Sequence, residues 1–362
     1  MIEKRIGATG VVRWRVRYRT PDYRQRSKTF ARRRDAEDFQ AEVRRSLHQG
    51  LFIDPNRGKI TLRVLWDEYE RTGMGHLRAT TRAQYRTASR HFLAQFGRWP
   101  VGKIEHADVA DWVTALSKVK GPSAVRSTYR VLCLLLDHGM RTRRISHNVA
   151  RGVRMPRQAP ARERVLPVQQ VEALAVRMGR EGDLVLTMAF LGLRWSELAA
   201  LTVADVDLSR GRVRVVERAT EVAGRIDVSA PKSRASHREV GVMGSLRSVL
   251  AARIEGKAPD DLVFSSPEGG YLRNGNWRNR SGWFDAVAEL GLDGITPHDL
   301  RRSFGSLARM AGADLRWIQK AMGHESITTT ARIYAHLYDD ELDAVAAALD
   351  TLRTPVTGVG EG

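Results

Sequence analysis

Four short segments in the second half of the chain bring together residue types that act on phosphate esters. Arginine forms bidentate bonds to phosphate oxygens, lysine and histidine carry protons, and a tyrosine hydroxyl can attack phosphorus. The segments are residues 191–198, 230–234, 296–302 and 322–325, and Tyr334 follows the last of them. Their candidate side chains are Arg194, Glu197, Lys232, His298, Arg301 and His324. Such a set suits cutting DNA by transesterification, although each residue taken alone is usually structural.

The order of these residues resembles that of one family. The chain is similar to the tyrosine recombinases, whose R…K…HxxR…H…Y signature is filled here by Arg194, Lys232, His298, Arg301, His324 and Tyr334. The Gly-Leu-Arg, His-Asp-Leu-Arg and Gly-His-Glu-Ser contexts are also similar, whereas Trp195 and the Arg302-Ser303 pair are substitutions at variable positions. The resemblance implies a site-specific recombinase that cuts and rejoins DNA through a 3′-phosphotyrosine intermediate.

Within that resemblance, Tyr334 would be the nucleophile. A free tyrosine has a pKa of about 10, so its hydroxyl needs help to lose a proton. Neighbouring guanidiniums and a histidine can give that help. His298 is the favoured partner for the tyrosine proton, and His324 would complete the cradle around the phosphate.

The remaining signature residues would stabilise charge and protonate the leaving group. Arg194 and Arg301 would bind the two non-bridging oxygens, because the planar guanidinium is always charged and matches phosphate geometry. Lys232, in a turn, would donate a proton to the departing 5′-oxygen. Glu197 would orient a neighbouring arginine or histidine and transfer no proton itself.

The sequence predicts no metal and no nucleotide cofactor. It contains no Walker-type glycine-rich loop, and its second half shows no cluster of carboxylates of the kind that binds two Mg²⁺ ions. A phosphotyrosine link keeps the energy of the broken phosphodiester. We therefore expect rejoining to need no outside energy source.

Helices and a few short strands must position these residues. Thr296 and Pro297 predict the start of a helix that places His298 and Arg301 on one face. Three small strands are marked by Val213, Val215, Ile226, Val228, Val240 and Val242, and helices continue to about residue 349. The resemblance implies a mixed α+β catalytic domain at 166–350 and a C-terminal tail at 351–362.

Residues 1–60 predict a small β-sheet backed by one helix. In residues 12–19 four apolar or aromatic side chains alternate with Arg13, Arg15, Arg17 and Arg19. A second strand is expected near 26–30 and a helix over 33–47. The row of arginines would contact DNA, since a major groove admits a β-ribbon. The resemblance implies an arm-type DNA-binding domain, and an arginine-rich solvent face on a structural hairpin is the alternative.

Residues 61–155 predict a helical bundle, which the resemblance identifies as a core-binding domain. Apolar residues recur at helical spacing over 62–71, 80–96, 107–119 and 123–141. Around residues 156–165 this periodicity is lost and prolines appear, which indicates a linker. The expected fold is thus multidomain and mainly α, with small β elements.

Composition and charge agree with a DNA-binding globular protein. The chain has 362 residues and a net charge of +19. Its hydrophobic content of 42%, with a mean hydropathy of −0.37, excludes a disordered or membrane-spanning chain. Residues 1–160 carry 34 basic and 14 acidic residues, against 26 and 27 in residues 161–362, so the first part is expected to bind nucleic acid. The N-terminus lacks the apolar segment of a signal peptide, and the single Cys133 excludes an intrachain disulfide, so a cytoplasmic location is expected.

Several functions fit these observations unequally. The favoured one is an integrase that joins a phage or other mobile element to a bacterial chromosome. A chromosome-dimer resolvase or transposon recombinase is the close rival, although such resolvases generally lack a domain like residues 1–60. A DNA-binding regulator would not need the whole signature, and a type IB topoisomerase would not need two basic regions. Expected partners are double-stranded DNA at core-type and arm-type sites and a homotetramer, with a host DNA-bending factor and an excision directionality factor as candidate accessory proteins.

Overall fold

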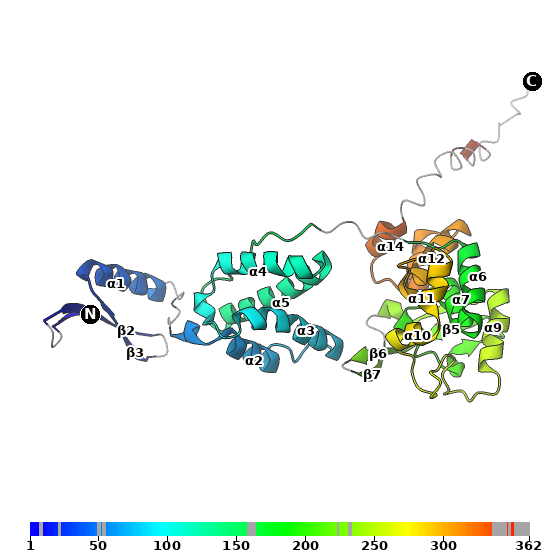
Figure 1. The fold of residues 1–362 in the computed structure, drawn as a ribbon, viewed down its shortest axis with the longest axis horizontal. Helices are drawn as coiled ribbons and strands as arrows, with labels where there is room; N and C mark the ends of the chain where they lie inside the picture. The colour runs from blue at the N-terminus through cyan, green and yellow to red at the C-terminus, as the bar shows by residue number, and fades with distance from the viewer. Residues whose placement is uncertain are drawn as a thin grey trace, which may run out of the picture. The chain divides into compact units, whose positions relative to one another are not determined.

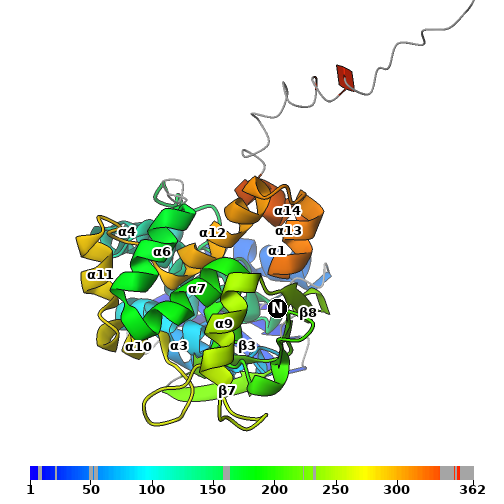
Figure 2. The ribbon, with the colours of Figure 1, turned by 90° about the vertical axis from the view of Figure 1, so that its right-hand side faces the viewer.

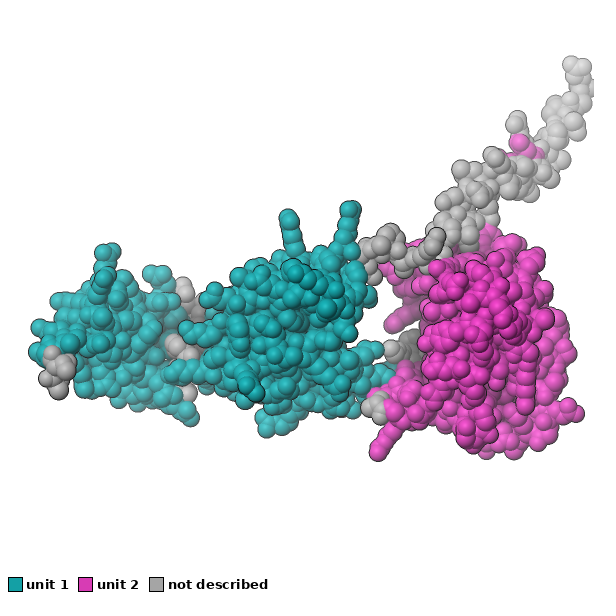
Figure 3. All heavy atoms as spheres, viewed as in Figure 1, with its two compact units in different colours: residues 1–160 teal, residues 161–362 magenta. Residues whose placement is uncertain are grey.

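The computed structural model describes residues 1–6, 10–20, 23–48, 52, 56–157, 164–222, 224–230, 234–334, 346 and 349–350. Its contacts divide the chain into two compact units, residues 1–160 and 161–362 (Figure 3). The boundaries at 60, at 155 and within the second unit stay predictions. Much of the predicted linker and the whole tail at 351–362 lie outside the described residues. Within the described residues, no helix is both long and apolar enough to cross a membrane.

A three-stranded antiparallel sheet begins the first unit. Its strands are β1 (Ile2–Ile6), β2 (Val12–Arg19) and β3 (Gln25–Phe30), in the order β1-β2-β3. Helix α1 (Arg33–His48) lies along one face of the sheet (Figure 1). On that face Val16 is buried, and the ring centroid of Tyr18 lies 5.6 Å from that of Phe39. The expected sheet with one helix is confirmed. Strand β1 was not predicted, because its sequence IEKRI lacks an alternating apolar face.

Four helices with one aromatic-rich core form the rest of the first unit. They are α2 (Leu62–Thr72), α3 (Ala79–Phe96), α4 (His106–Val119) and α5 (Pro122–Arg141), and each bound lies within one residue of its prediction. The local signals are strong: Thr61 accepts a hydrogen bond from the amide of Val64 at the start of α2, and Pro122 begins α5. Phe92 and Phe96 pack edge-on against Trp112 in the core.

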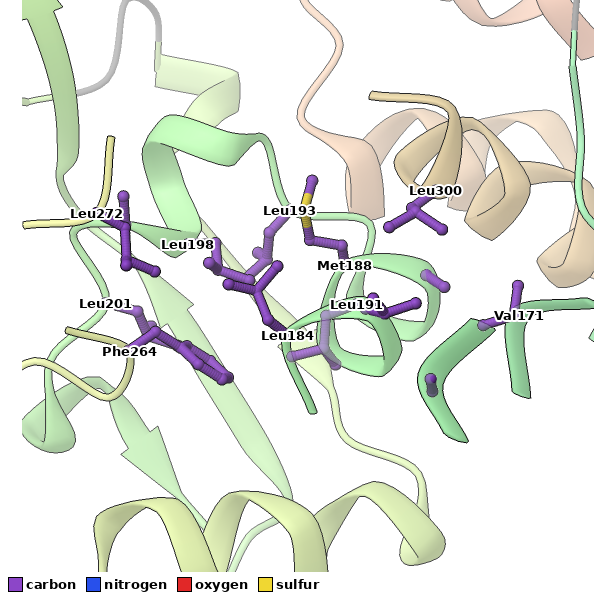
Figure 4. Close-up of a cluster of buried hydrophobic side chains, with 14 of the residues drawn as sticks. Val171, Leu184, Met188, Leu191, Leu193, Leu198, Leu201, Phe264, Leu272 and Leu300 are labelled. Atoms are coloured by element: carbon purple, nitrogen blue, oxygen red, sulfur yellow. The ribbon is translucent and has the colours of Figure 1, made fainter. Parts of the chain in front are cut away.

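The second unit is built around α7 (Gly182–Leu191), which is apolar on nearly all sides and therefore buried. Helix α7 packs on α6 (Val168–Arg177), α9 (Gly244–Ile254) and α12 (Pro297–Met310). Figure 4 shows Leu184, Met188 and Leu191 of α7 in a cluster with leucines from the neighbouring elements. The other α-helices are α8 (Trp195–Leu198), α10 (Asn274–Arg280), α11 (Trp283–Glu289), α13 (Leu315–Met322) and α14 (Ile327–Tyr334). Short 3-10 turns lie at Arg57–Lys59, Val101–Lys103, Gly179–Glu181, Val203–Asp205 and Arg234–Ser236.

The second unit has more strands than the three that the valine pattern predicted. A sheet of order β4-β5-β8 is formed by Val206–Asp207, Arg212–Val215 and Arg238–Gly241. A separate hairpin pairs β6 (Arg218–Val222) with β7 (Arg225–Ser229). The sequences of β4 and β6 were not recognised, because two or five mostly polar residues give no clear period-two signal.

Helices α12, α13 and α14 lie together on one side of the second unit (Figure 2). Helix α13 also contacts β8. The loop between α7 and α8, strand β8 and the ends of α12 to α14 therefore carry the candidate site.

Candidate active site

Arg194 is positioned by a sharp turn at the end of α7. Gly192 ends the helix in the left-handed region with φ of 62°, and a Cβ there would overlap the ring of Phe304, so this position requires glycine. Arg194 then precedes α8, where its backbone N–H donates to Glu197 Oε2 at 2.9 Å. The Arg194 side chain binds the same carboxylate, because its Nη1 donates to Glu197 Oε1 at 2.6 Å.

Arg301 is held inside the second unit by helix α12. As predicted, Thr296 and Pro297 start this helix, with the Thr296 N–H donating to Asp299 Oδ2 at 2.9 Å. One turn later the Arg301 side chain is only 2% exposed and donates to the carbonyls of Gly192 and Met322. Burial, and then the charge of Arg194, lower the pKa of Arg301 to about 9, so the guanidinium keeps its charge at neutral pH.

One buried carboxylate, that of Glu197, lies among three guanidiniums. Arg238 Nη2 lies 3.0 Å from Glu197 Oε2, Arg194 Nη1 lies 2.6 Å from Oε1, and Arg301 Nη1 lies 3.8 Å from Oε2. Burial alone would raise the pKa of Glu197, but the nearby positive charges outweigh it and hold this pKa at about 2. Glu197 is therefore ionised at any physiological pH.

The same three arginines hold the C-terminal end of α13. Three consecutive carbonyls accept hydrogen bonds there: Ala321 from Arg238 Nε at 2.6 Å, Met322 from Arg301, and Gly323 from Arg194 Nη2 at 3.0 Å. The last carbonyls of a helix have no partner within it and carry the negative end of the helix dipole. These guanidiniums therefore cap α13.

Two histidines border this cluster. His324 follows the cap of α13, and its Nδ1 lies 2.9 Å from Thr330 Oγ1. Desolvation, followed by the charges of Arg301 and Arg194, lowers the pKa of His324 to about 4, so the ring is neutral at neutral pH. His298 reaches solvent at the start of α12, and desolvation followed by the charge of Arg301 lowers its pKa as well.

Tyr334 lies at the end of α14 with its ring buried to 1% exposure. Its hydroxyl donates to the carbonyl of Arg302 at 3.1 Å, and the same oxygen lies 3.4 Å from Met322 Sδ. The ring lies directly on Gly305 of α12, where an added Cβ would overlap Tyr334 Cζ. Tyr334 thus packs beside the residue whose carbonyl accepts from Arg301.

The structure brings Arg194, Glu197, Arg301 and His324 together, with His298 and Tyr334 at their border. Lys232 lies outside the described residues. Sequence reasoning missed Arg238, although it is a charged residue on the inward face of β8, two positions before the buried Val240. A period-two reading of this strand would have identified it.

The predicted DNA-binding arginines share one face of the N-terminal sheet. Because side chains alternate along β2, Arg13, Arg15, Arg17 and Arg19 lie opposite the face that α1 covers. Arg17 is 40% exposed and lies 3.3 Å from the carboxylate of Glu3 on β1. No group of three or more potential metal ligands is found among the side chains that the structure describes.

Comparison with known proteins identifies the family. Residues 169–341 match the model of the phage integrase family. Tyrosine recombinase XerD of Mycobacterium leprae (strain TN) is 30% identical over 263 residues, which cover 67% of this chain and 81% of the relative. This chain belongs to the tyrosine recombinase family. A second member, XerC of Roseiflexus sp. (strain RS-1), is 33% identical over 192 residues, 53% of this chain and 54% of that protein. The chain spans about half the length of the first curated relatives that it matches.

Solved tyrosine recombinases share the fold. An integrase of the transposon Tn1549 in complex with a circular intermediate DNA has a TM-score of 0.67 at 20% identity, covering 80% of this chain and 99% of that one. A lambda integrase dimer bound to a COC′ core site has a TM-score of 0.61 at 16% identity, with 91% and 93% covered. A lambda integrase fragment covers 76% of this chain.

Proposed function

We propose that the protein is a site-specific recombinase that cuts and rejoins DNA by transesterification at Tyr334. The observation that carries this proposal is the cluster of three guanidiniums around Glu197, with the Tyr334 hydroxyl packed beside it. Three positive charges and one negative charge leave a net charge of +2 for a phosphate. Such a site stabilises the additional charge of a pentacovalent phosphate.

Arg194 is the guanidinium that meets the phosphate first. Its side chain is 36% exposed, against 2% for Arg301, and two of its five N–H groups are used by Glu197 and Gly323. The remaining N–H groups can bind non-bridging oxygens. Arg301 is buried and binds the phosphate only after the carbonyls that it contacts have moved away. Lys232 protonates the departing 5′-oxygen.

Tyr334 must move before it can react. A hydroxyl that donates to the Arg302 carbonyl on a buried ring cannot reach DNA. In the attack, the Tyr334 hydroxyl gives up this hydrogen bond and its oxygen forms a bond to phosphorus. The phenolic proton passes to a base. His298 is that base, because its lowered pKa leaves it neutral and it lies at the solvent side of the cluster. The phosphotyrosine bond conserves the energy of the cut bond, so rejoining follows without ATP or metal.

The biological reaction we propose is integration of a phage or other mobile element. Residues 1–60 would bind arm-type DNA through the arginine face of β2, residues 61–155 the core-type site, and residues 166–350 would carry the chemistry. Two observations support this proposal. The N-terminal sheet is basic, and the longer lambda integrase structure covers more of this chain than the lambda integrase fragment does. We further propose a homotetramer on DNA, by analogy with a lambda integrase tetramer that was solved bound to a Holliday junction.

A housekeeping resolvase or a transposon recombinase is the second candidate. The names of the sequence relatives XerC and XerD and the Tn1549 fold neighbour favour it. The two candidates differ in the role of the sheet. If Arg13→Ala/Arg15→Ala weakens binding to distal arm-type DNA and spares core-site binding, the integrase is supported. If all specific sites are bound equally well by this variant, the resolvase or transposon recombinase is favoured.

The chemistry is tested with a nicked suicide substrate that traps the covalent complex. The wild-type protein should form an SDS-resistant protein–DNA adduct, also in excess EDTA, and Tyr334→Phe should bind this DNA normally and form none. Tyr338→Phe is the matched control, because it removes a neighbouring tyrosine hydroxyl outside the signature, and it should form the adduct. An adduct that persists in Tyr334→Phe contradicts the proposal, as does cleavage that only Mg²⁺ restores.

A further inference from the structure

Arg238 on β8 is the third guanidinium of the candidate site, and the catalytic signature does not contain it. Its side chain is 5% exposed. Both terminal nitrogens bind Glu197, with Nη2 3.0 Å from Oε2 and Nη1 3.3 Å from Oε1. This bidentate pairing is the geometry in which an arginine fixes a carboxylate most firmly.

The third nitrogen of Arg238 joins the carboxylate to helix α13. Its Nε donates to the Ala321 carbonyl at 2.6 Å, one residue before the carbonyl that Arg301 binds and two before the one that Arg194 binds. Every nitrogen of the Arg238 side chain thus has an acceptor within the protein. Because this side chain is only 5% exposed and each of its nitrogens is already bonded within the protein, Arg238 does not face DNA, and its role is indirect.

The backbone around α13 is adapted to this side chain. Gly323 caps α13 in the left-handed region, and a Cβ on it would lie 3.0 Å from Arg238 Nη1. Any other residue at 323 would press on the guanidinium as well as strain the turn. His324 follows directly, so the position of Arg238 also bears on where this ring lies.

Removing Arg238 would change the charge and the geometry of the cluster. Glu197 would then be shared by Arg194 and Arg301 alone, and the net charge would fall from +2 to +1. The released carboxylate could also turn further toward Arg194. Both changes weaken the hold of Arg194 on a phosphate, because Glu197 then competes with the phosphate for the same N–H groups.

We propose that Arg238 is a positioning residue for strand cleavage. It fixes Glu197 and the end of α13, and so keeps the Arg194 guanidinium free to bind the scissile phosphate. The proposal rests on the recombinase function proposed above. It assigns to Arg238 an effect on the rate of cleavage that exceeds its effect on DNA binding.

The test compares Arg238→Met, which keeps the length of the side chain and removes its charge, with Arg238→Lys, which keeps the charge and loses the bidentate fork. The control is Arg214→Met on the neighbouring β5, since Arg214 is an exposed arginine of the same sheet that donates to the Ala204 carbonyl. Single-turnover cleavage of the suicide substrate, the Kd for the same DNA and the thermal unfolding midpoint are measured for each.

We expect Arg238→Met to lower the cleavage rate about 10²-fold, the size of effect that misplacement of a catalytic group produces, with a Kd near that of the wild type. Arg238→Lys should recover part of the rate, and Arg214→Met should cleave normally. Equal rates for the Met and Lys variants, or loss of cleavage only in proportion to lost binding or folding, would overturn the proposal. If Arg238→Met does not fold, the cleavage rate of Arg238→Lys provides the test. A wild-type cleavage rate in this folded variant would show that the bidentate guanidinium is not needed and would overturn the proposal.

The controls separate this proposal from the proposed function. A wild-type protein that forms no adduct at Tyr334 overturns both. A wild-type protein that forms the adduct, with an Arg238→Met variant that cleaves at the same rate, contradicts the role of Arg238 alone and leaves the function supported.

Discussion

The arginines of β2 and the buried arginines around Glu197 occupy opposite environments. On β2 of the first unit, Arg17 is 40% exposed and has the partly exposed Glu3 as its partner. In the second unit, Arg238 and Arg301 are 5% and 2% exposed and share one carboxylate that is itself 2% exposed. The first arrangement supplies a charged surface that water and salt screen, whereas the second supplies charges fixed in place.

This difference indicates that the exposed arginines contribute to DNA affinity, whereas the buried arginines contribute to the cleavage reaction. Exposed arginines bind a polyanion by releasing counterions, and any one of them is nearly replaceable. Buried guanidiniums keep their direction, because turning one leaves a carbonyl or a carboxylate without its partner. We therefore expect substitutions in the two regions to differ in the size of their effect and in the quantity that they change.

The largest expected effect comes from removing the buried anion. Glu197→Ala leaves Arg238 and Arg301 buried without their shared carboxylate, which should lower the free energy of unfolding by about 3–5 kcal/mol. Glu3→Ala removes a partly exposed carboxylate from the sheet and should change the free energy of unfolding by about 0.2–1 kcal/mol. Denaturant titrations of the two variants give the comparison, and similar losses would contradict the distinction between the regions.

The pH dependence of stability reports on the same carboxylate. The pKa of Glu197 is about 2 in the folded protein, against 4.5 for the unperturbed group. The unfolded chain takes up this proton at higher pH, so the stabilisation is complete above pH 4.5 and is lost as the pH falls towards 2. His324 adds to the loss, since its lowered pKa makes the unfolded state the better proton acceptor below pH 6.5. Between pH 4.5 and 3, wild-type stability should fall more steeply than that of Glu197→Gln, and parallel curves would contradict the low pKa.

Arg194→Ala should lower the rate of strand cleavage about 10²–10³-fold, as loss of one oriented donor to a developing charge does elsewhere. Binding of DNA should change much less, because most phosphate contacts remain. Arg15→Ala is the counterpart in the exposed region, and its cleavage rate at saturating protein should equal that of the wild type. Single-turnover rates on the suicide substrate measure both. A larger rate loss for Arg15→Ala would reverse the comparison.

The close packing of the buried region predicts a third contrast. Gly305→Ala places a Cβ in overlap with Tyr334 Cζ, so the ring must shift, at a cost of about 1–3 kcal/mol in the free energy of unfolding. Gly275→Ala in α10 meets no atom within 4 Å and should stabilise by up to about 1 kcal/mol. Replacing Tyr334 with alanine should remove most of the cost of Gly305→Ala. Additive losses in this double variant would show that the ring does not lie on Gly305.

The smallest effect is expected on the exposed sheet. Arg15→Ala should reduce the magnitude of the negative slope of log K for DNA binding against log salt concentration by about one. It should weaken DNA binding only slightly. Arg45→Ala on α1 is the control, because α1 covers the opposite face of the sheet. Fluorescence anisotropy at several KCl concentrations measures the slope. An equal change in both variants would mean that the β2 face has no preferred role.

Local signals made much of the fold predictable. The alternation in residues 12–19 determined both faces of β2, and Thr296 with Pro297 marked the start of α12. The bundle helices follow from their apolar spacing and from Thr61 and Pro122 at their starts. Strands β1, β4 and β6 were missed, because their short sequences give no clear alternation of apolar and polar residues, although each pairs with the strand that follows it in the sequence.

The residue types of the candidate site were visible in the sequence, but their environment was not. Arg238 lies 41 residues after Glu197, so only the packed fold shows that they pair. The burial of Arg301 and Tyr334 likewise depends on how α12, α13 and α14 pack against one another. A motif predicts which side chains act, whereas tertiary packing decides which of them face solvent.

The central claim is tested most directly by identifying the residue that becomes joined to DNA. The adduct formed on the suicide substrate is digested with nuclease and trypsin, and the nucleotide-bearing peptide is sequenced by tandem mass spectrometry. We predict a nucleotide linked through its 3′-phosphate to Tyr334. Attachment at Tyr338, at any other side chain, or DNA ends cut without a covalent protein link would contradict the account.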